Sequence, residues 1–559
     1  MTPGKRLLPA TFFGAFLIYA DIATRQPLPG NARIKLGIQT AGGAPTGLRL
    51  RVTNAAGEYF APLGHLPTAD YSSRNANDLI LGDGTTTPLE VHALVYDGTE
   101  IDLPPGHYNF HANKGYEYQT IDAPVDVSAT QRMNVALPLR KFADFEARGW
   151  IPGDTHMHFP DPNGIRYQME CEGLRVCSLL LLKSGYKTGR PGDGHFENIE
   201  HFTGKLSPVS DANHFVQVGE EFRHGLLAHL IFQNLKSIVW PVSVGGLREG
   251  GMGGFDWPMM LDAADDARAQ GALVSWAHWP YPSLEAPLDI ALGRIDSIDL
   301  LTTGNPFQHH PILVDVYKMH GPAVYSLAPI DVYYHYLNCG FRLAMSSGSD
   351  KMALNPPMGS ARTYVKTDGP LTYQSWIDGI RKGRTFASNY PLLEFTVNGK
   401  EAGATLTLPV GRVKLAVTAH AVSLEPYEQL EIIHNGKVIR TVKPSGGHFD
   451  ATFDEVIEVD RGGWIAARAH GRKMLPYGAT WWQMPVFAHS SPIYLEMSGR
   501  PAPAAESARL FLDQLGYLRR WVEEQAKFPL PENKAEAIAR VAAAEAIYKG
   551  LAARDVSVK

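Results

Sequence analysis

Hydrophobic and polar residues alternate in short runs through the first 145 residues of the chain. Apolar stretches such as FFGAFLIYA, ARIKLGI, LRLRV, EVHALVY and MNVALPL are separated by turns rich in Gly, Pro and Asn. Short runs of this kind between turn residues are typical of the strands of a β-sandwich. We therefore expect residues 1–145 to form an N-terminal β-sandwich, without a ligand cluster of its own.

The pattern changes near residue 146, where continuous apolar runs begin to alternate with helical segments. VCSLLLL (176–182) suits a strand that is covered on both faces. WPMMLDAADDARAQ (257–270) has a proline near its start and a glycine just beyond its end, as helices often do. Strands and helices continue to alternate after this helix. The segments are the strand-like ALVSWAH and IDSIDLL, a helical stretch before Gly340, the strand-like FRLAMSSGSD and the helical LTYQSWIDGIRK. This alternation predicts an α/β domain over residues 146–390.

Strand-like segments return in the C-terminal part of the chain. LLEFTVNG, VKLAVTAHA, EQLEIIHNGKVIRTV, GGWIAARAHG and SPIYLE follow one another, and two Asn-Gly steps mark tight turns between strands. They predict a second β-sandwich over residues 391–500. Residues 501–559 read as two amphipathic helices separated at FPLPENK, and we expect a helical hairpin there.

Composition narrows the class of protein. A chain of 559 residues is too long for one compact core, and 44% hydrophobic and 19% charged residues are ordinary for a globular protein. The net charge of -5 and the lack of a basic block argue against nucleic-acid binding. Three cysteines, Cys171, Cys177 and Cys339, make no disulfide framework and are expected to be reduced.

The N-terminus allows two interpretations. Lys5 and Arg6 precede the run LLPATFFGAFLIYA, as in a signal peptide, but the run continues directly into a polar turn and another strand-like stretch. We favour a strand of the mature protein over a signal in residues 1–23. No other apolar run approaches the about 20 residues of a membrane helix. The sequence therefore favours a cytoplasmic protein without a membrane segment, and leaves a secreted or periplasmic location and the oligomeric state open.

Candidate chemistry begins in the stretch GWIPGDTHMHFPDP, where Asp154, His156 and His158 occupy every second position. Side chains alternate between the faces of a strand, so all three are expected to point the same way. Two histidines spaced in this way can reach one cation or a close pair of cations. A polar surface strand is the alternative interpretation.

Other strand ends offer further ligands. Glu221 ends an apolar strand within VQVGEEFRHG, and His229 lies inside the apolar run LLAHLIF. His278 in SWAHWP and Asp350 in SSGSD follow two more strands. In barrel-like α/β domains such strand ends line the active face, so we expect these groups to converge with the HxH pair on a metal. Alternatively, His278 packs between tryptophans and Asp350 caps a turn.

The ordered set of motifs resembles one family. The chain resembles CehA/McbA-type metallohydrolases, which belong to the PHP (polymerase and histidinol phosphatase) superfamily. The similar segments are GWIPGDTHMH, GEEFRHGLLAHL, SWAHWP, LNCGFRLAMSSGSDKM and WIDGIRKGRTFASNYPLLEFTVNGK. The similarity covers roughly residues 100 to 410. It implies a distorted (β/α) barrel with a multinuclear metal site, and the named members hydrolyse the carbamate ester carbaryl. Position by position, it makes metal ligands of His156, His158, Glu221, His229, His278 and Asp350.

The chain departs from the pattern of that family at two places. Met352 stands where PHP proteins often have a histidine two residues after the aspartate, and the second strand ends as LLLLKSG, without an acidic or histidine ligand. Lys183 in that segment would become a ligand only if it were carbamylated. We therefore expect one or two divalent ions, Zn, Mn or Fe, rather than three.

The expected reaction is hydrolysis of an ester, carbamate or amide bond of a small molecule by a metal-activated water. Asp350 or Glu221 would act as general base. Lys351, Arg362 and Arg223 are candidate donors to the oxyanion or leaving group, with ordinary supporting charges as the alternative. Metal-dependent phosphoester hydrolysis and a non-catalytic, metal-containing binding protein are the competing functions.

The remaining polar and aromatic candidates have supporting roles. Asp154 is expected to orient an imidazole from behind the ligands. Glu220 and His224 adjoin the glutamate motif without an assigned role. Aromatic residues near the motifs would favour an aromatic or apolar substrate, or would only pack the walls: Phe159, Trp276, Trp279, Tyr281 and Phe307. Four histidines in or beside a predicted helix are expected at the surface or in packing: His309, His310, His320 and His335.

Overall fold

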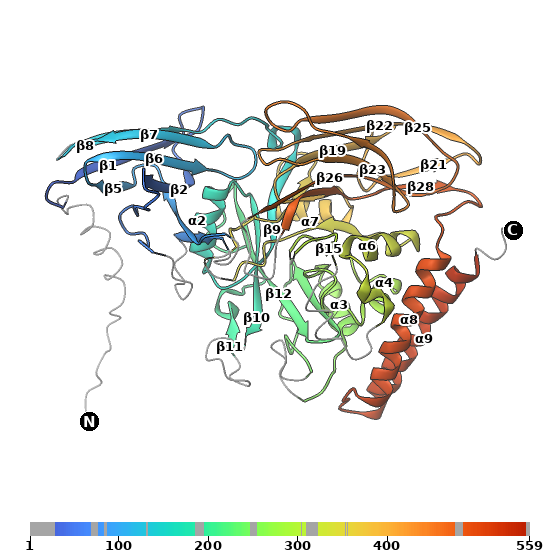
Figure 1. The fold of residues 1–559 in the computed structure, drawn as a ribbon. Coiled ribbons are helices and arrows are strands. Elements are labelled where there is room, and N and C mark those ends of the chain that lie inside the picture. Colours follow the sequence, from blue (N-terminus) through green and yellow to red (C-terminus); the bar gives the residue numbers. More distant parts are fainter. Residues whose placement is uncertain are drawn as a thin grey trace, which may run out of the picture.

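The structure is a computed structural model, and it describes residues 28–68, 77–82, 87–129, 132–184, 195–245, 254–302, 304–308, 322–352, 354, 356–475 and 484–554. It is a strand-rich, mixed α/β protein, with β layers at both ends of the sequence above a central α/β unit (Figure 1). Residues 1–23 and the histidines His309, His310 and His320 lie outside the described residues, and so do the predictions made for them.

The N-terminal part consists of two sheets around one apolar core. The first has the order β5-β1-β8 and the second the order β3-β4-β2-β6-β7. Alternating residues such as Ile34, Leu50 and Phe110 point from both sheets into the shared core, as expected from the period of two in the sequence. The strands are β1 (Ala32–Gln39), β2 (Gly47–Asn54), β3 (Asp78–Leu81), β4 (Glu90–Tyr96), β5 (Glu100–Leu103), β6 (Gly106–Asn113), β7 (Ile121–Val127) and β8 (Arg132–Pro138).

The central part is built on a curled, half-barrel sheet with the order β16-β15-β14-β13-β12-β10-β9-β17-β18. Strands β9, β10 and β12 are parallel, β14, β15 and β16 are parallel, and β13 runs antiparallel between the two groups. The strands are β9 (Trp150–Met157), β10 (Val176–Ser184), β11 (His195–Glu197), β12 (Phe215–His224), β13 (Ala228–Gln233), β14 (Leu273–Trp276), β15 (Ser297–Asp299), β16 (Ala344–Ser346), β17 (Arg362–Lys366) and β18 (Thr385–Ser388).

The curl brings the segment after β16, at one end of this run, next to β9. Asp350 N, just after β16, donates to His156 O at 2.8 Å, and His158 N donates to Lys351 O at 3.0 Å. The segment after β16 therefore meets the carboxyl end of β9. Helices cover the sheet: α2 (Pro162–Glu172), α3 (Met260–Ala269), α4 (Ala286–Ala291), α6 (Pro329–Asn338) and α7 (Tyr373–Arg381), with 3-10 turns at Glu146–Arg148, Ile199–His201 and Ala323–Ser326.

The C-terminal β layers share a sheet with the central part. Strand β18 pairs with β27, and the sheet continues through β26, β23 and β24, so it crosses the boundary expected at residue 390 without interruption. A second sheet, β20-β19-β22-β25, packs on it. The strands are β19 (Leu392–Val397), β20 (Lys400–Glu401), β21 (Thr405–Leu408), β22 (Val413–Val422), β23 (Gln429–His434), β24 (Lys437–Val442), β25 (Ala451–Val459), β26 (Gly463–Leu475), β27 (Met484–Ser490) and β28 (Ile493–Met497).

The last two helices, α8 (Ala505–Glu524) and α9 (Pro531–Arg554), lie side by side against the central part (Figure 1). The Phe511 ring of α8 stacks on Tyr336 of α6 with centroids 3.8 Å apart, and Tyr548 of α9 donates to Pro287 O at 3.0 Å. The expected helical hairpin is present. Among the helices of the described residues, none combines the length and apolar character that crossing a bilayer requires.

Candidate metal centre

Five segments bring ligand side chains to one edge of the curled sheet. His156 is the penultimate residue of β9 and His158 directly follows the strand, while Glu221 lies near the end of β12. Strand β13 is antiparallel to β12, so His229 near its start lies at the same edge. His278 follows β14 and Asp350 follows β16. The sequence placed His278 and Asp350 correctly after strands, and the fold brings all six predicted ligands into two adjacent groups.

The first group consists of His156, His158 and Asp350. The two imidazole Nε2 atoms lie 2.9 Å apart, and each is 3.3 Å from Asp350 Oδ1. Both histidines are buried, whereas the side chain of Asp350 is 23% exposed. This group therefore reaches solvent on the side of Asp350.

The second group consists of Glu221, His229 and His278. His229 Nδ1 and His278 Nε2 lie 3.0 Å apart and are 3.1 and 3.3 Å from Glu221 Oε1. The other nitrogen of His278, Nδ1, is hydrogen-bonded to the backbone carbonyl of Tyr281. A second hydrogen bond of this kind fixes an imidazole so that its opposite nitrogen faces a ligand.

Glu221 connects the two groups. Its Oε1 faces His229 and His278, and its Oε2 lies 3.2 Å from His158 Nε2 and 3.8 Å from that of His156. Burial alone would raise the pKa of Glu221, but Arg223 and the surrounding imidazoles hold that pKa well below its usual value. Glu221 is thus an ionised carboxylate that presents one oxygen to each group.

The donor set fits a pair of divalent cations. Zinc bonds of 2.0–2.1 Å to two imidazoles in tetrahedral geometry separate the nitrogens by about 3.3 Å, close to the separations in both histidine pairs. Imidazole and carboxylate ligands suit Zn, Mn or Fe, and a carboxylate can bridge two ions. Facing nitrogen lone pairs at such distances repel unless a proton or a cation lies between them, so each pair is arranged for a shared positive charge.

Two of the ligand residues have strained backbones. His278 has a φ of 30° and Asp350 a φ of 48°, values that non-glycine residues rarely adopt. Gly348, close to Asp350, approaches His156 so closely that an added Cβ would lie 2.4 Å from His156 N. Backbone strain of this kind persists where the surrounding structure enforces it and is concentrated at functional sites.

Asp154 supports the site, but not in the way expected. Its carboxylate does not bind an imidazole; it accepts hydrogen bonds from the backbone N–H groups of His156, Ser349 and Gly359 at 3.0, 2.9 and 2.8 Å. The Ser349 hydroxyl donates to it as well. The buried Asp154 therefore fixes the backbone next to Asp350 and at His156 at the same time.

Lys351 and Arg362 do not reach the two groups. The ammonium of Lys351 donates to Pro356 O at 3.0 Å, and burial lowers its pKa to about 7. Arg362 donates to Gly359 O at 2.8 Å, and its guanidinium lies 3.9 Å from the centre of the Tyr116 ring. Both side chains therefore hold the segment between β16 and β17 through its backbone carbonyls. The structure offers no geometric basis for the expected donor roles.

Three residues near the motifs also lie outside the ligand set. Glu220 points to the opposite face of β12 and accepts from Val239 N at 2.9 Å. His224 lies 3.0 Å from Asp256 and accepts from two backbone N–H groups of the following turn. Lys183 is buried at the end of β10, and burial lowers its pKa. Because side chains alternate between the two faces of β12, Glu220 and His224 point away from the face that carries Glu221.

Asp299 belongs to the surroundings of the site and was not identified from the sequence. It ends β15, where it accepts from the hydroxyls of Thr155 at 2.9 Å and Ser346 at 2.5 Å. Burial raises the pKa of Asp299 to about 6, even though the charge of nearby His156 opposes the shift. No clear signal in the sequence marks Asp299, because two leucines follow it in IDSIDLL and only the structure shows that the strand ends there.

The aromatic residues divide into two kinds. Trp276 and Trp279 are core residues that pack edge to face, and their indole N–H groups donate to backbone carbonyls. Phe307 packs on His470 and Phe487 of the C-terminal sheet. Rings beside the ligands come from Phe159, 6.0 Å from the His158 ring, and Tyr281, 6.3 Å from the His278 ring.

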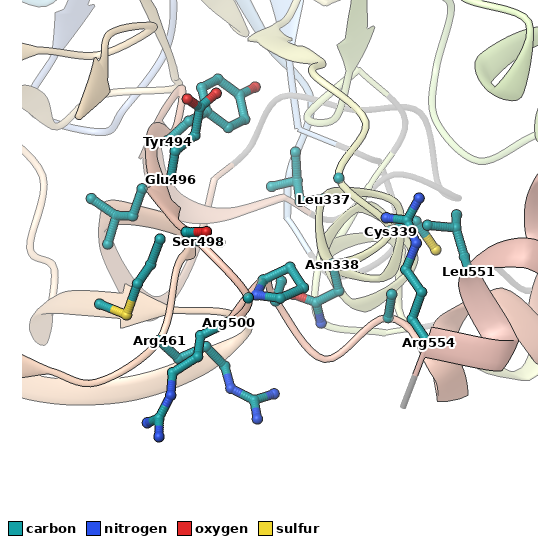
Figure 2. A pocket seen from close by; sticks show the side chains of 18 of the residues that line it. Leu337, Asn338, Cys339, Arg461, Tyr494, Glu496, Ser498, Arg500, Leu551 and Arg554 are labelled. Atoms are coloured by element: carbon teal, nitrogen blue, oxygen red, sulfur yellow. The ribbon is translucent and has the colours of Figure 1, made fainter. Parts of the chain in front are cut away.

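A large cavity lies away from these groups. It measures about 910 Å³ and is lined by residues of α6, the turn before β26, β28, the segment 498–504 and the end of α9, including Arg461, Arg500 and Arg554 (Figure 2). None of the six ligands lines it.

No model of a known protein family and no curated protein matches the chain. The functional interpretation therefore depends on the residues of the site.

Proposed function

We propose that the protein is a metal-dependent hydrolase that cleaves an ester, carbamate or amide bond of a small molecule. One observation carries the proposal: a buried, ionised glutamate, Glu221, presents one oxygen to each of two histidine pairs. His156, His158 and Asp350 would hold one cation, and His229 and His278 the other. When bound, such cations lower the pKa of a coordinated water and stabilise negative charge that develops on an attacked carbonyl.

The proton of the attacking water is assigned to Asp350 rather than to Glu221. Both oxygens of Glu221 face imidazoles, and its side chain is 1% exposed, so it has no free edge toward a substrate. The side chain of Asp350 is 23% exposed at the rim of the first group. A general base must lie within hydrogen-bonding reach of the proton that it takes, and Asp350 meets this condition from the solvent side.

The curl of the central sheet is the observation that supports proposing the PHP-like barrel that the motifs imply. Five segments bring the six proposed ligands to one edge of the curled sheet, as in barrels whose strand ends line the active face. We propose a distorted barrel of this kind and one or two ions of Zn, Mn or Fe. Phe159 and Tyr281 are the rings that an aromatic or apolar substrate would meet first.

The test is hydrolysis with and without chelator. The protein is assayed with nitrophenyl acetate, a naphthyl carbamate and nitrophenyl phosphate, and each rate is compared before and after complete removal of metal. The proposal expects turnover of the ester or the carbamate that is lost with the metal. Turnover of the phosphate alone would identify a phosphoesterase, and bound metal without any turnover would identify a binding protein.

Two neighbouring glutamates provide a matched pair of variants. Glu221→Gln removes the charge between the groups, and we expect hydrolysis to fall by at least about 100-fold together with metal content. Glu220→Gln is the control, because burial raises the pKa of Glu220 well above its usual value and an amide resembles the protonated acid. Equal effects of the two substitutions would refute the assignment of Glu221.

A further inference from the structure

The two ligand groups differ in the charges that surround them. The first group contains the Asp350 carboxylate and faces Glu221 Oε2, so oxygens of two carboxylates border its imidazoles. In the second group Glu221 Oε1 is the carboxylate oxygen that lies beside both imidazoles, and Arg223 Nε is 3.5 Å from this oxygen. We propose that Arg223 competes with the second cation, so that the group of Glu221, His229 and His278 binds its cation more weakly than the first group does.

The competition concerns a single lone pair. Arg223 Nε donates to His229 Nδ1 at 3.3 Å and lies 3.5 Å from Glu221 Oε1. A nitrogen that accepts this hydrogen bond has its lone pair engaged, and the ring proton is then on Nε2. A cation at the second group needs the same lone pair of Nδ1. The guanidinium and the cation therefore exclude each other at His229.

The strand pairing keeps Arg223 in this position. Arg223 of β12 and His229 of β13 are directly opposite each other, so both side chains emerge on the same face. The backbone of Arg223 is held by Val242 and Ser243, since Arg223 N donates to Val242 O at 3.3 Å and Arg223 O accepts from the Ser243 hydroxyl at 3.0 Å. Only the side chain can move away, and it is itself nearly buried, at 8% exposure.

The consequence for the protein is ordered loading of the two groups. The inference rests on the proposed function, because it concerns the cations of that site. Like charge close to a cation raises the cost of binding where little water screens the two charges. The first group is then filled at low metal concentration, and the second only when metal is more abundant. Hydrolysis that needs both cations would depend on the supply of metal over that range.

Titration of the stripped, full-length protein with Co²⁺ tests the inference without an activity assay. Calorimetry gives the number and affinity of the binding events, and visible absorption reports the ligand field of each. We expect two events in the natural protein, and Arg223→Gln should tighten the weaker one by about 10–100-fold while the tighter one stays unchanged. Arg223→Met, with a neutral stem of similar length, should act in the same direction.

Arg166→Gln is the control, since this guanidinium lies near the surface and pairs with Asp211 at 2.7 Å. Unchanged affinities of both events in Arg223→Gln and Arg223→Met would overturn the inference while leaving the metal site intact. Loss of the weaker event in these variants would also overturn it, because Arg223 would then support the cation. Failure of the natural protein to bind any Co²⁺ would instead contradict the proposed function.

Discussion

Replacement of Asp154 by asparagine tests how the ligand segments are held together. The carboxylate accepts three backbone N–H groups and one hydroxyl, from His156, Ser349 and Gly359. An amide keeps one oxygen and puts an NH₂ group where the other oxygen was. The Ser349 hydroxyl can rotate and accept from that NH₂ group, whereas the backbone N–H of Gly359 cannot and loses its acceptor.

The expected loss of stability follows from these contacts. A buried donor without a partner costs about 1–3 kcal/mol, and hydrogen bonds to a neutral acceptor are weaker than those to a charged one by about 1 kcal/mol. We therefore expect Asp154→Asn to lower the free energy of unfolding by about 2–4 kcal/mol. Metal affinity should fall by about 10–100-fold, because the backbone at His156 and beside Asp350 is no longer fixed.

Urea denaturation and metal titration of the same preparations measure the two effects. Asp97→Asn is the control: Asp97 accepts one backbone N–H, from Ile38 at 2.7 Å, and an asparagine retains that acceptor. It should change stability by less than about 1 kcal/mol and leave metal affinity unaltered. If Asp154→Asn behaved like Asp97→Asn in both measurements, the reasoning about Asp154 would be refuted.

Three further substitutions test the neighbouring groups. Arg362→Met should lower the free energy of unfolding by about 2–4 kcal/mol, because the hydrogen bond to Gly359 O and the contact with Tyr116 are lost. The folded variant should still bind metal, and loss of metal would contradict the supporting role of Arg362. His224→Ala should cost about 1–3 kcal/mol, again without loss of metal, which elemental analysis checks. Burial raises the pKa of Glu285 in the folded protein to about 7, from an ordinary value of 4.5. Because the unfolded chain then loses this proton at lower pH than the folded protein does, the free energy of unfolding should fall as the pH rises from about 4.5 to 7. Glu285→Gln should flatten that part of the stability profile, and an unchanged slope would contradict the explanation.

Much of the fold could be predicted from local pattern. The apolar run VCSLLLL became β10, the capped segment near residue 260 became α3, and the tail became two packed helices. The pairing of β18 with β27 could not be predicted, because it joins segments about a hundred residues apart and depends on edges that no local pattern marks. The domain boundary expected at residue 390, where the sequence pattern changes, therefore falls within one continuous sheet.

For the site, too, features set by the local sequence could be predicted, and features set by contacts between distant segments could not. Ligands at strand ends were visible because the period of a strand and the position after it are local properties. The role of Asp154 was not visible, since its partners Ser349 and Gly359 lie some two hundred residues away. Arg362 was expected at the reaction centre, but a close approach in sequence to a ligand segment does not determine which way a side chain turns.

The most direct measurement is a crystal structure of the metal-loaded protein with anomalous diffraction recorded at the absorption edge of the bound metal. We expect two anomalous peaks, one on either side of the Glu221 carboxylate. One peak should lie among His156, His158 and Asp350, and the other, weaker at limiting metal, between His229 and His278. Absence of any peak beside Glu221 in crystals grown with saturating Zn²⁺ or Mn²⁺ would show that the six residues do not hold a metal.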